Sequence, residues 1–397
     1  MKIESIEIHN FKSLQNVSLT EIPGLAVFRG PIGGGKNTFF EVFAFLQDAL
    51  ATDVITALQL RGGFNEVVSR DQKEDISFLI RYRPFTCDGI LTYELSIGLD
   101  GQKIPVVNTE SLFWKGEKLK EAWKIMEFHR GKGMATCCDP PPFQEPLLET
   151  LYETKLISPH VLALNAIGNL ADHIVVARFR YLIENCLICD FQIDDARKIQ
   201  KLALPNQLTK TGNNLATVAH YMLTKHPHNF RIVLDKMKKL VPRISGIYTK
   251  TTEDKVVSLR FVEEGFEKAF LSTQVSSETI KIFMYLLLLN SPEPRPLLLI
   301  KDPTYQLEPT IISSLLKLFR NYTVEGYYNN PGQVFISFNA TLLHLELYSN
   351  ELYVLSKDKN RYTEVLHGST SLNSYSLPAK DQAPGALSKL TLVTDDS

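Results

Sequence analysis

The stretch "FRGPIGGGKNTFF" occupies residues 28–40 and joins a predicted strand to a predicted helix. Gly30, Gly35 and Lys36 have the G-x-x-x-x-G-K spacing of a phosphate-binding loop, in the strand–loop–helix context that this motif requires. Backbone N–H groups in such a loop converge on an anion, and the helix N-terminus adds a partial positive charge. A glycine-rich hairpin turn, the alternative, leaves the lysine and the helix that follow it unexplained. The stretch therefore predicts an anion site.

Lys36 would reach the terminal phosphates of a nucleotide, and the row of glycines before it lets the backbone approach them without a side-chain clash. Asn37 departs from the motif, because a Ser or Thr hydroxyl at that position would bind magnesium. Thr38 carries a hydroxyl, but one position late. We expect phosphate binding to survive and magnesium to be poorly positioned. The candidate residues of the loop are Gly30, Gly33, Gly34, Gly35, Lys36, Asn37 and Thr38.

The composition is that of a soluble globular protein. Of the 397 residues, 44% are hydrophobic and 22% are charged, which argues against a disordered or collagen-like chain. The formal net charge of −1 gives no overall attraction to nucleic acid, so DNA binding would need a local basic patch. At this length the chain has room for one large domain or for several ordinary ones.

No segment predicts a membrane span. The opening "MKIESIEIHNFKSL" alternates charged and apolar residues and predicts a strand, not a signal peptide. The most apolar run, "IKIFMYLLLLNSPEPRPLLLIKDP" (280–303), is interrupted by Asn290 and then by Pro292, Pro294 and Pro296. It predicts a buried helix and then a buried strand.

The five cysteines are few and odd in number, which fits a reducing cytosol and predicts a cytoplasmic protein. Cys186 and Cys189 in "CLIC" have zinc-like spacing, but no second Cys or His pair stands in a matching arrangement. We therefore interpret both as thiols that face a core, and we predict no metal site.

Apolar strands flanked by helices occur at both ends of the chain. Toward the N-terminus, a helix is predicted at 37–51 and strands at 3–9, 17–20, 25–29, 76–82, 91–99 and 111–114. Toward the C-terminus, a helix is predicted at 277–289 and strands at 247–250, 256–261, 296–300 and 333–338, with "ELYVLSKD" and "RYTEVLH" as a last pair. This alternation predicts an α/β fold with a mostly parallel sheet, covered on both faces and assembled from both ends.

The same patterns divide the chain into four parts. Residues 1–145 carry the loop, 146–241 are mainly helical and form an insert, and 242–368 return to strands and helices. Residues 369–397 are rich in Ser, Pro, Gly and Lys and predict a disordered tail.

The chain resembles the ABC-type ATPases of the RecF and SMC class from residue 1 to about 367, and in particular a bacterial group of RecF-like ATPases. The opening, the loop and "RGGFNEVVSR" (61–70) are similar to the first part of that family, and "DFQIDDARK" and "NNLATVAHYM" to its helical insert. "VSSETIKIFMYLLLL", "PLLLIKDPTYQLEP" and "GQVFISFNATLL" stand, in order, where the family has its signature, Walker B and switch segments. The resemblance implies a P-loop NTPase fold of ABC type, with a mixed sheet and a helical insert.

The catalytic positions of that family are changed in this chain. Lys301 replaces the metal-associated acid of Walker B, and Asp302, one methylene shorter than Glu, stands at the general base. Asn339 stands where the switch segment has its histidine, and an amide can hydrogen-bond but cannot carry a proton. The signature keeps Ser276 but has Glu278 in place of its glycine, which puts an anion where the family turn faces the γ-phosphate of the other subunit.

Four altered positions on four segments predict a nucleotide site that binds better than it cleaves. The resemblance implies ATP as the ligand, a head-to-tail homodimer around it, and a role linked to DNA repair or phage defence. Ser276 and Asn339 would contact the nucleotide, magnesium binding would be weak, and Asp302 is the remaining candidate for the base. Two interpretations stay open: a slow ATPase that acts through Asp302, and a pseudo-ATPase that serves as a scaffold or regulatory partner.

Asp194, Asp195 and Arg197 are either a functional patch of the insert or a helix-capping cluster, and we favour capping because Asp is common in the first turn of a helix.

The basic runs "KMKKLVPR" (236–243) and "RFRY" (178–181) have the composition of solvated helix faces, although they would suit DNA phosphates as well. His226 and His228 are interpreted as loop residues and not as ligands.

Overall fold

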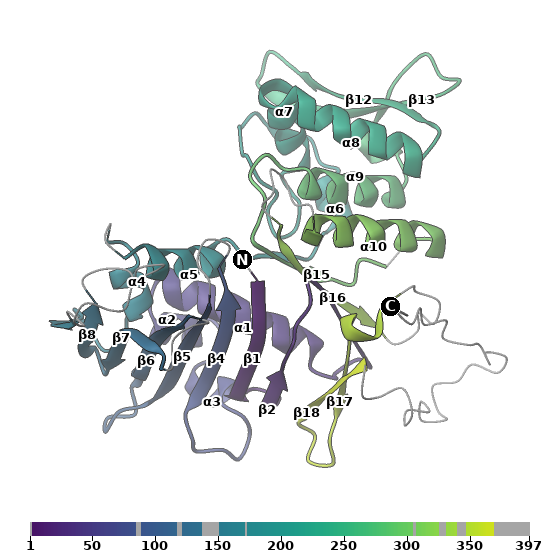
Figure 1. Cartoon of the computed structure of the whole chain (residues 1–397). Helices are drawn as coiled ribbons and strands as arrows, with labels where there is room; N and C mark the ends of the chain where they lie inside the picture. The colour runs from purple at the N-terminus through teal and green to yellow at the C-terminus, as the bar shows by residue number, and fades with distance from the viewer. Residues whose placement is uncertain are drawn as a thin grey trace. The chain divides into compact units, whose positions relative to one another are not determined.

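The computed structural model describes residues 2–84, 89–116, 121–136, 151–170, 173–304, 307–324, 331–339 and 347–368. The chain divides into two compact units (Figure 1). Among the described residues, unit 1 contains those up to Cys186, Asn339 and those from Leu347 onward, and unit 2 contains Leu187–Phe338. The division at Cys186 falls inside the stretch predicted as a single insert. The predicted tail, 369–397, lies outside the described residues.

Unit 1 is built on an eight-stranded sheet with the order β2-β1-β4-β5-β6-β7-β8-β9. Its strands are β1 (Lys2–Phe11), β2 (Leu14–Leu19), β4 (Ile76–Arg83), β5 (Ile90–Leu99), β6 (Pro105–Lys115), β7 (Trp123–His129), β8 (Lys132–Thr136) and β9 (Leu151–Lys155). Every neighbouring pair in it is antiparallel.

This sheet corrects the expectation of a mostly parallel sheet. Residues in β4 alternate strictly between buried and half-buried, which is the pattern of an antiparallel sheet with one covered face. From β4 to β8 the connections between strands are too short for a helical crossover, so these consecutive strands pair as hairpins. The continuous apolar runs near the C-terminus are typical of parallel strands. The expectation was wrong because it applied the pattern of these runs to the strands of the whole chain. β7 and β8 were not among the predicted strands.

A second group of strands in unit 1 joins the two ends of the chain. β3 (Leu25–Gly30) is parallel to β17 (Leu352–Lys357), and β17 pairs antiparallel with β18 (Thr363–His367). This confirms the predicted final pair of strands and the assembly of a sheet from both ends. β3 leads into the glycine loop, so the hairpin β17–β18 lies beside that loop.

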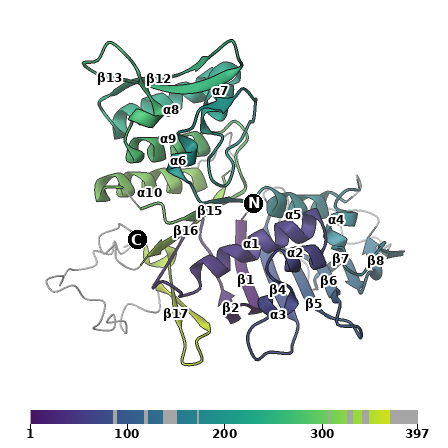
Figure 2. The same ribbon diagram turned by 180° about the vertical axis from the view of Figure 1, so that it is seen from behind.

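Helix α1 (Lys36–Ala51) is the centre of the core of unit 1. Its aromatic side chains contact both groups of strands: Phe39 packs on Phe28 of β3, and Phe45 packs on Phe11 and Phe78 of the large sheet. A helix with apolar residues on more than one side is buried on more than one side. Seen from behind, α1 and α2 (Val54–Gln59) cover one face of the large sheet (Figure 2).

The remaining helices of unit 1 are α3 (Phe64–Val67), α4 (Ala163–Ile167), α5 (Ile174–Glu184) and a short 3-10 turn at Ser349–Glu351. Phe179 of α5 packs between Tyr82 and Tyr93, with ring centroids 4.8 and 4.7 Å away, so α5 covers the same face as α1.

Unit 2 contains three parallel strands: β10 (Leu187–Cys189), β15 (Leu297–Lys301) and β16 (Gln333–Asn339). Helix α9 (Ser277–Leu289) precedes β15, and α10 (Pro309–Val324) connects β15 to β16, as a parallel pair requires. α9 is buried on all sides from Thr279 to Leu289. Tyr285 contacts Phe319 of α10. On the opposite side of α9, Phe283 contacts Phe230 and Phe261.

A small antiparallel sheet forms the rest of unit 2. β13 (Val256–Glu263) pairs with β12 (Ile244–Thr251), β11 (Gln200–Lys201) and β14 (Phe270–Leu271). Helices α6 (Ile193–Ala196), α7 (Leu215–Lys225) and α8 (Pro227–Leu240) and a 3-10 turn (Ser272–Gln274) accompany it. The stretch predicted to be mainly helical thus also supplies β9, β10 and β11 to three sheets. β9 pairs with the preceding strand β8, whereas the short strands β10 and β11 pair with β15 and β13, which are distant in sequence.

Candidate functional site

The glycine loop lies between β3 and α1, where the sequence predicts it. Gly33 and Gly35 have φ angles of 81° and 106°, in the left-handed region that favours glycine. Gly35 is also the N-cap residue of α1 and offers no side-chain cap to the first turn. The N-terminus of α1 therefore begins directly at the loop, without a side chain that satisfies its N–H groups.

The loop is packed closely against the hairpin β17–β18. A Cβ atom on Gly34 would lie 2.8 Å from the carbonyl oxygen of Leu355, and one on Gly30 would collide with the same oxygen. A Cβ atom on Gly35 would collide with the side chain of Thr363. Only glycine fits at these three positions, so the loop conformation depends on residues more than three hundred positions away.

Lys36 is 7% exposed and folds back over the loop. Its Nζ donates to the carbonyl oxygens of Gly30 at 2.6 Å and Pro31 at 2.9 Å. The ammonium group therefore lies inside the loop, where it would meet an anion bound there. Among the described residues, none accepts from the backbone N–H of Asn37 or Thr38, so the first turn of α1 has donors to offer.

The signature segment in unit 2 has its polar groups engaged in structural bonds. Ser276 is the N-cap of α9, and its Oγ accepts from the backbone N–H of Thr279 at 3.2 Å. Glu278 accepts through Oε1 from the backbone N–H of Glu308 at 3.1 Å, just before α10 begins. A carboxylate at a helix N-terminus is favourable, which gives a structural reason for an anion at the position of the family's glycine.

Arg197 holds this segment in place, a role that sequence reasoning missed. Its Nη2 donates to the carbonyl oxygen of Val275 at 2.5 Å and to Oγ of Ser277 at 3.2 Å. Ser272 Oγ in turn donates to the carbonyl oxygen of Arg197 at 2.8 Å. Asp194 and Asp195 occupy the first turn of α6, as the capping interpretation expects. The sequence around Arg197 contains no signal that its side chain binds a segment about 80 residues away.

The segment that resembles Walker B carries charged groups at the ends of the parallel strands. Lys301 Nζ lies 3.4 Å from Oδ2 of Asp190, which follows the neighbouring strand β10. Asp302 has a φ of 37° and accepts from Oγ1 of Thr304 at 2.7 Å. Lys301 stands at the position of the family's metal-associated acid, and here it forms an ion pair with the carboxylate of Asp190.

Lys281 is a buried charged residue that the sequence interpretation omitted. It is buried in α9, and burial lowers its pKa to about 8, against the opposing effect of the Asp302 charge. Its signal in the sequence was a lone charge among the apolar residues of "ETIKIFMYLLLL".

The predicted site residues fall into two groups. Unit 1 brings together the seven loop residues, and unit 2 contains Ser276 and Asp302; that the two groups meet around one nucleotide stays a prediction. Asn339 is the last residue of β16, and its side chain lies outside the described part of the structure. In the described residues no group of three or more His, Cys, Asp or Glu side chains is arranged to hold a metal ion.

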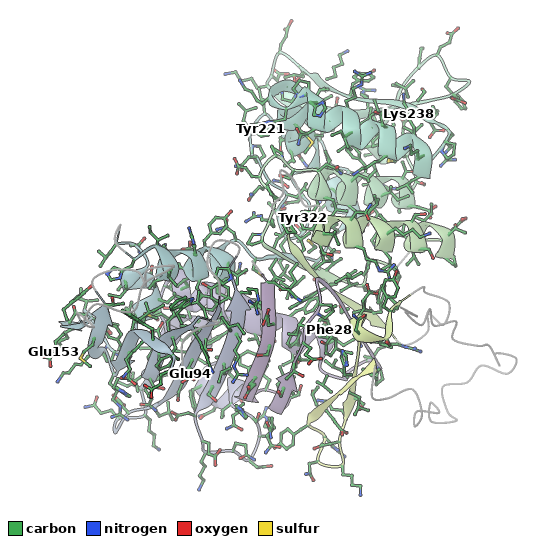
Figure 3. All side chains as sticks on the ribbon, in the orientation of Figure 1. Phe28, Glu94, Glu153, Tyr221, Lys238 and Tyr322 are labelled. Carbon is green, nitrogen blue, oxygen red and sulfur yellow. The ribbon has the colours of Figure 1, made fainter. Side chains whose placement is uncertain are left out.

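The other candidates from the sequence lie in the core or at the ends of helices. Cys186 and Cys189 are buried free thiols, and burial raises the pKa of Cys189, which agrees with their assignment to the core. His226 is the N-cap of α8 and lies 3.2 Å from the Tyr221 hydroxyl. Lys238, labelled with Tyr221 in Figure 3, lies in the last turn of α8, where a cation is favourable.

The overall fold can be compared with known proteins. No family model matches the sequence, and no curated protein does. The solved structure of an SMC head bound to the C-winged helix domain of ScpA matches with a TM-score of 0.53 and 12% identity, over 92% of this chain and 98% of that one. This chain has a fold similar to that of an SMC head.

An SMC head domain from Thermotoga maritima also matches, with a TM-score of 0.41 and 10% identity, over 92% of this chain and 99% of that one. The SMC-head likeness agrees with the mixed α/β fold expected from the sequence. No helix among the described residues is long and apolar enough to cross a membrane.

Proposed function

We propose that the chain is a cytoplasmic ATP-binding protein of the RecF and SMC class in which hydrolysis is weak or lost. The observation that carries the proposal is the loop of unit 1: a buried lysine ammonium next to a helix N-terminus at which the N–H groups of Asn37 and Thr38 have no acceptor among the described residues. Both features favour a phosphate group. The SMC-like fold supports ATP as the source of that phosphate.

Weak hydrolysis follows from the altered positions. Phosphoryl transfer depends on positioning and on electrostatic stabilisation. Lys301 has the wrong sign to hold magnesium, and Asn37 has no hydroxyl for it. The losses act on one site, so together they cost several powers of ten in rate, but not additively.

A pseudo-ATPase that acts as a scaffold or regulatory partner is the second candidate. Glu278 and Lys301 favour it, because each has taken a structural partner in place of a catalytic one. In this proposal, residues 1–145 and 242–368 form the ATPase head and 146–241 its insert. Three further parts of the proposal rest on the resemblance. They are a head-to-tail dimer around the nucleotide, a partner protein, as the SMC head has in ScpA, and a role in DNA repair or phage defence.

The test pairs calorimetric ATP binding with phosphate release, each with and without magnesium. We expect ATP binding that hardly depends on magnesium and phosphate release near background. Lys36→Ala should weaken binding by about a hundredfold, since it removes a charge-assisted contact and disturbs the loop. Lys132→Ala, which removes an exposed lysine of β8 in the same unit, is the matched control and should change nothing.

Two outcomes separate the candidates, and two others contradict the proposal. Binding without turnover favours the pseudo-ATPase, and slow turnover that Asp302→Asn abolishes favours the weak ATPase. No binding contradicts both nucleotide roles. Brisk, magnesium-dependent turnover that is lost in Lys36→Ala contradicts the argument for lost hydrolysis. Light scattering with and without ATP tests the dimer.

A further inference from the structure

A polar cavity of about 650 Å³ opens on the outer face of the large sheet in unit 1, on the side away from α1. It is formed by β1, β2, β4 and β5, which lie side by side in Figure 1, and by residues 72–75, the segment before β4. Its volume is in the range of small-molecule sites. None of the residues proposed to bind ATP lines it.

The floor of the cavity is a row of cross-strand neighbours. Asn16 of β2 is opposite His9 of β1, His9 is opposite Ser77 of β4, and Ser77 is opposite Ser96 of β5. Side chains of directly opposed residues lie next to each other on one face of a sheet. The two serines are the smallest members of the row, and their size leaves the floor hollow between the larger residues around them.

Asp75 is held rigidly in the wall of this cavity. Its Oδ2 accepts from Oγ of Ser96 at 2.6 Å and from Nδ2 of Asn108 at 2.7 Å. Gly98 makes room for the carboxylate, because a Cβ atom there would collide with Asp75 Oδ1. Arg130 reaches the far side of Asn108, with Nε donating to Oδ1 at 3.0 Å, and it does not line the cavity. Both bonds to Asp75 come from neutral donors, so no cation among the described residues neutralises its charge.

Further acceptors surround Asp75. Glu74 is exposed, and no described residue pairs with its carboxylate. Asn10 is 4% exposed; its Nδ2 donates to the carbonyl oxygen of Asp75 at 3.1 Å, and no described residue donates to its Oδ1. The amides of Gln15 and Gln72 complete the rim.

The charge balance of the lining selects the sign of a ligand. No lysine or arginine lines the cavity, and His9 is the only lining residue able to become cationic. Two carboxylates repel a phosphate or a carboxylate ligand and attract a cation. No phenylalanine, tyrosine or tryptophan is among the lining residues and His9 supplies one small ring, so a sugar ring or a nucleobase would find little stacking surface.

We propose that this cavity binds a guanidinium group, with Asp75 and Glu74 as its anionic partners and the Asn10 amide oxygen as a third acceptor. A guanidinium carries five N–H donors in a planar fork and no acceptor, which suits several acceptors spread over one wall. A compact ammonium would reach fewer of them. The group comes either from a small molecule or from an arginine side chain of a partner protein.

The test is calorimetric titration of the full chain at low ionic strength, without nucleotide, with agmatine as the small-molecule probe. Carbamoylputrescine, in which a neutral urea replaces the guanidinium, is the control ligand. We expect saturable one-to-one binding of agmatine and binding of carbamoylputrescine that is weaker by about tenfold, the loss of one charge-assisted bond. Equal binding of the two compounds, or no saturable binding of agmatine, overturns the proposal.

Three variants locate the site. Asp75→Asn should weaken agmatine binding by about tenfold or more. Glu74→Gln, at an exposed position without structural bonds, should weaken it by about threefold and keeps the test valid if Asp75→Asn unfolds the unit. Glu94→Gln is the matched control: Glu94, labelled in Figure 3, lies on β5 outside the cavity lining and should leave binding unchanged. Unchanged binding in both cavity variants contradicts the assignment.

A second arm distinguishes the two sources of the guanidinium. The peptide acetyl-Gly-Arg-Gly-amide is compared with its citrulline counterpart and with agmatine. Tighter binding of the arginine peptide than of agmatine indicates a protein partner, and tighter binding of agmatine indicates a small molecule. Either result requires that the citrulline peptide binds more weakly; if it binds as well as the arginine peptide, the guanidinium assignment is wrong. ATP is absent from every arm, so failure here leaves the proposed ATP site untouched.

Discussion

The loop needs glycine at neighbouring positions for two different physical reasons. Gly33 has a φ of 81° but open space around it, so a side chain there costs only backbone strain. Gly34 has no left-handed backbone, but a Cβ atom would lie 2.8 Å from the Leu355 carbonyl oxygen and 3.1 Å from that of Pro31. Gly35 combines both restrictions, with a φ of 106° and a collision with Thr363. It is therefore the least replaceable of the three.

Gly35→Ala should lower the free energy of unfolding by about 3 kcal/mol, the sum of left-handed strain and overpacking. Urea denaturation measures the change. Gly101→Ala is the control, because nothing lies within 4 Å of its Cβ position and its φ is not left-handed, so the change should stay within about 0.5 kcal/mol. Equal effects of the two substitutions would show that the loop does not pack on Thr363.

Glu110 is a fully buried carboxylate in unit 1 whose pKa is raised from 4.5 to about 7, mainly by burial. It accepts from the backbone N–H groups of Ala163 and Leu164, at the start of α4, and from the Tyr93 hydroxyl. These bonds oppose the shift, because they favour the charged form. The folded chain thus keeps a proton that the unfolded chain releases between these two pH values.

The free energy of unfolding should therefore fall as the pH rises from about 4.5 through about 7, because the folded state binds the extra proton in this window. Glu110→Gln removes the titration and should flatten this slope. The difference in the free energy of unfolding between the natural chain and the variant should change by about 3 kcal/mol over the window. Urea denaturation at a series of pH values measures it. Glu94→Gln, on the exposed side of β5, should leave the slope as it is.

At the scale of elements, the start of α9 is fixed by side chains from two other segments. Arg197, beside α6, binds the turn before it through Val275 and Ser277, and Glu278 in its first turn caps the start of α10. The signature segment is thereby tied to both neighbouring helices. A rigid turn with its serine and glutamate already engaged is poorly suited to close on a phosphate.

Arg197→Ala should loosen the start of α9 and lower the free energy of unfolding by about 2 kcal/mol, since it removes charge-assisted bonds to the Val275 carbonyl and the Ser277 hydroxyl. Hydrogen exchange of peptides that cover residues 272–280 should become faster. Arg231→Ala, an exposed position of α8, serves as the control and should leave the exchange of these peptides unchanged. Slow exchange in both variants would mean that Arg197 does not hold the turn.

At the scale of the whole molecule, the proposed loss of hydrolysis is a property of four segments together. Asn37 belongs to unit 1, Glu278 and Lys301 to unit 2, and Asn339 ends β16. A single substitution restores one family residue, and the site then still lacks the other three. Restoring all of them repairs metal binding, phosphate contact and proton transfer at once.

The fourfold variant Asn37→Ser, Glu278→Gly, Lys301→Asp and Asn339→His should therefore show magnesium-dependent phosphate release at least about tenfold above the natural chain, and no single substitution should reach this rate. Phosphate release measures the gain. Adding Lys36→Ala to the fourfold variant should abolish it. A fourfold variant that is folded by circular dichroism, binds ATP and still releases no phosphate contradicts the proposed cause of the loss.

The sequence predicted much of the local structure from short-range patterns. The strand at the start, the loop, α1, α9 and the strand at 296–300 were found because the period of apolar residues and the glycines that punctuate them are local signals. The eight-stranded antiparallel sheet was missed, because strand direction depends on which segments pair and not on the apolar content of each. β10 was missed because a three-residue strand has no period to detect.

By itself, the sequence determined that a glycine loop joins a strand to a helix within residues 30–38, since spacing and backbone freedom are properties of the chain. Only the tertiary structure decided why these glycines are required, because Leu355 and Thr363 reach the loop from the other end of the chain. It also gave Glu278 and Lys301 their partners, Glu308 and Asp190. Contacts between distant residues form only when the chain has folded, and a local pattern carries no record of them.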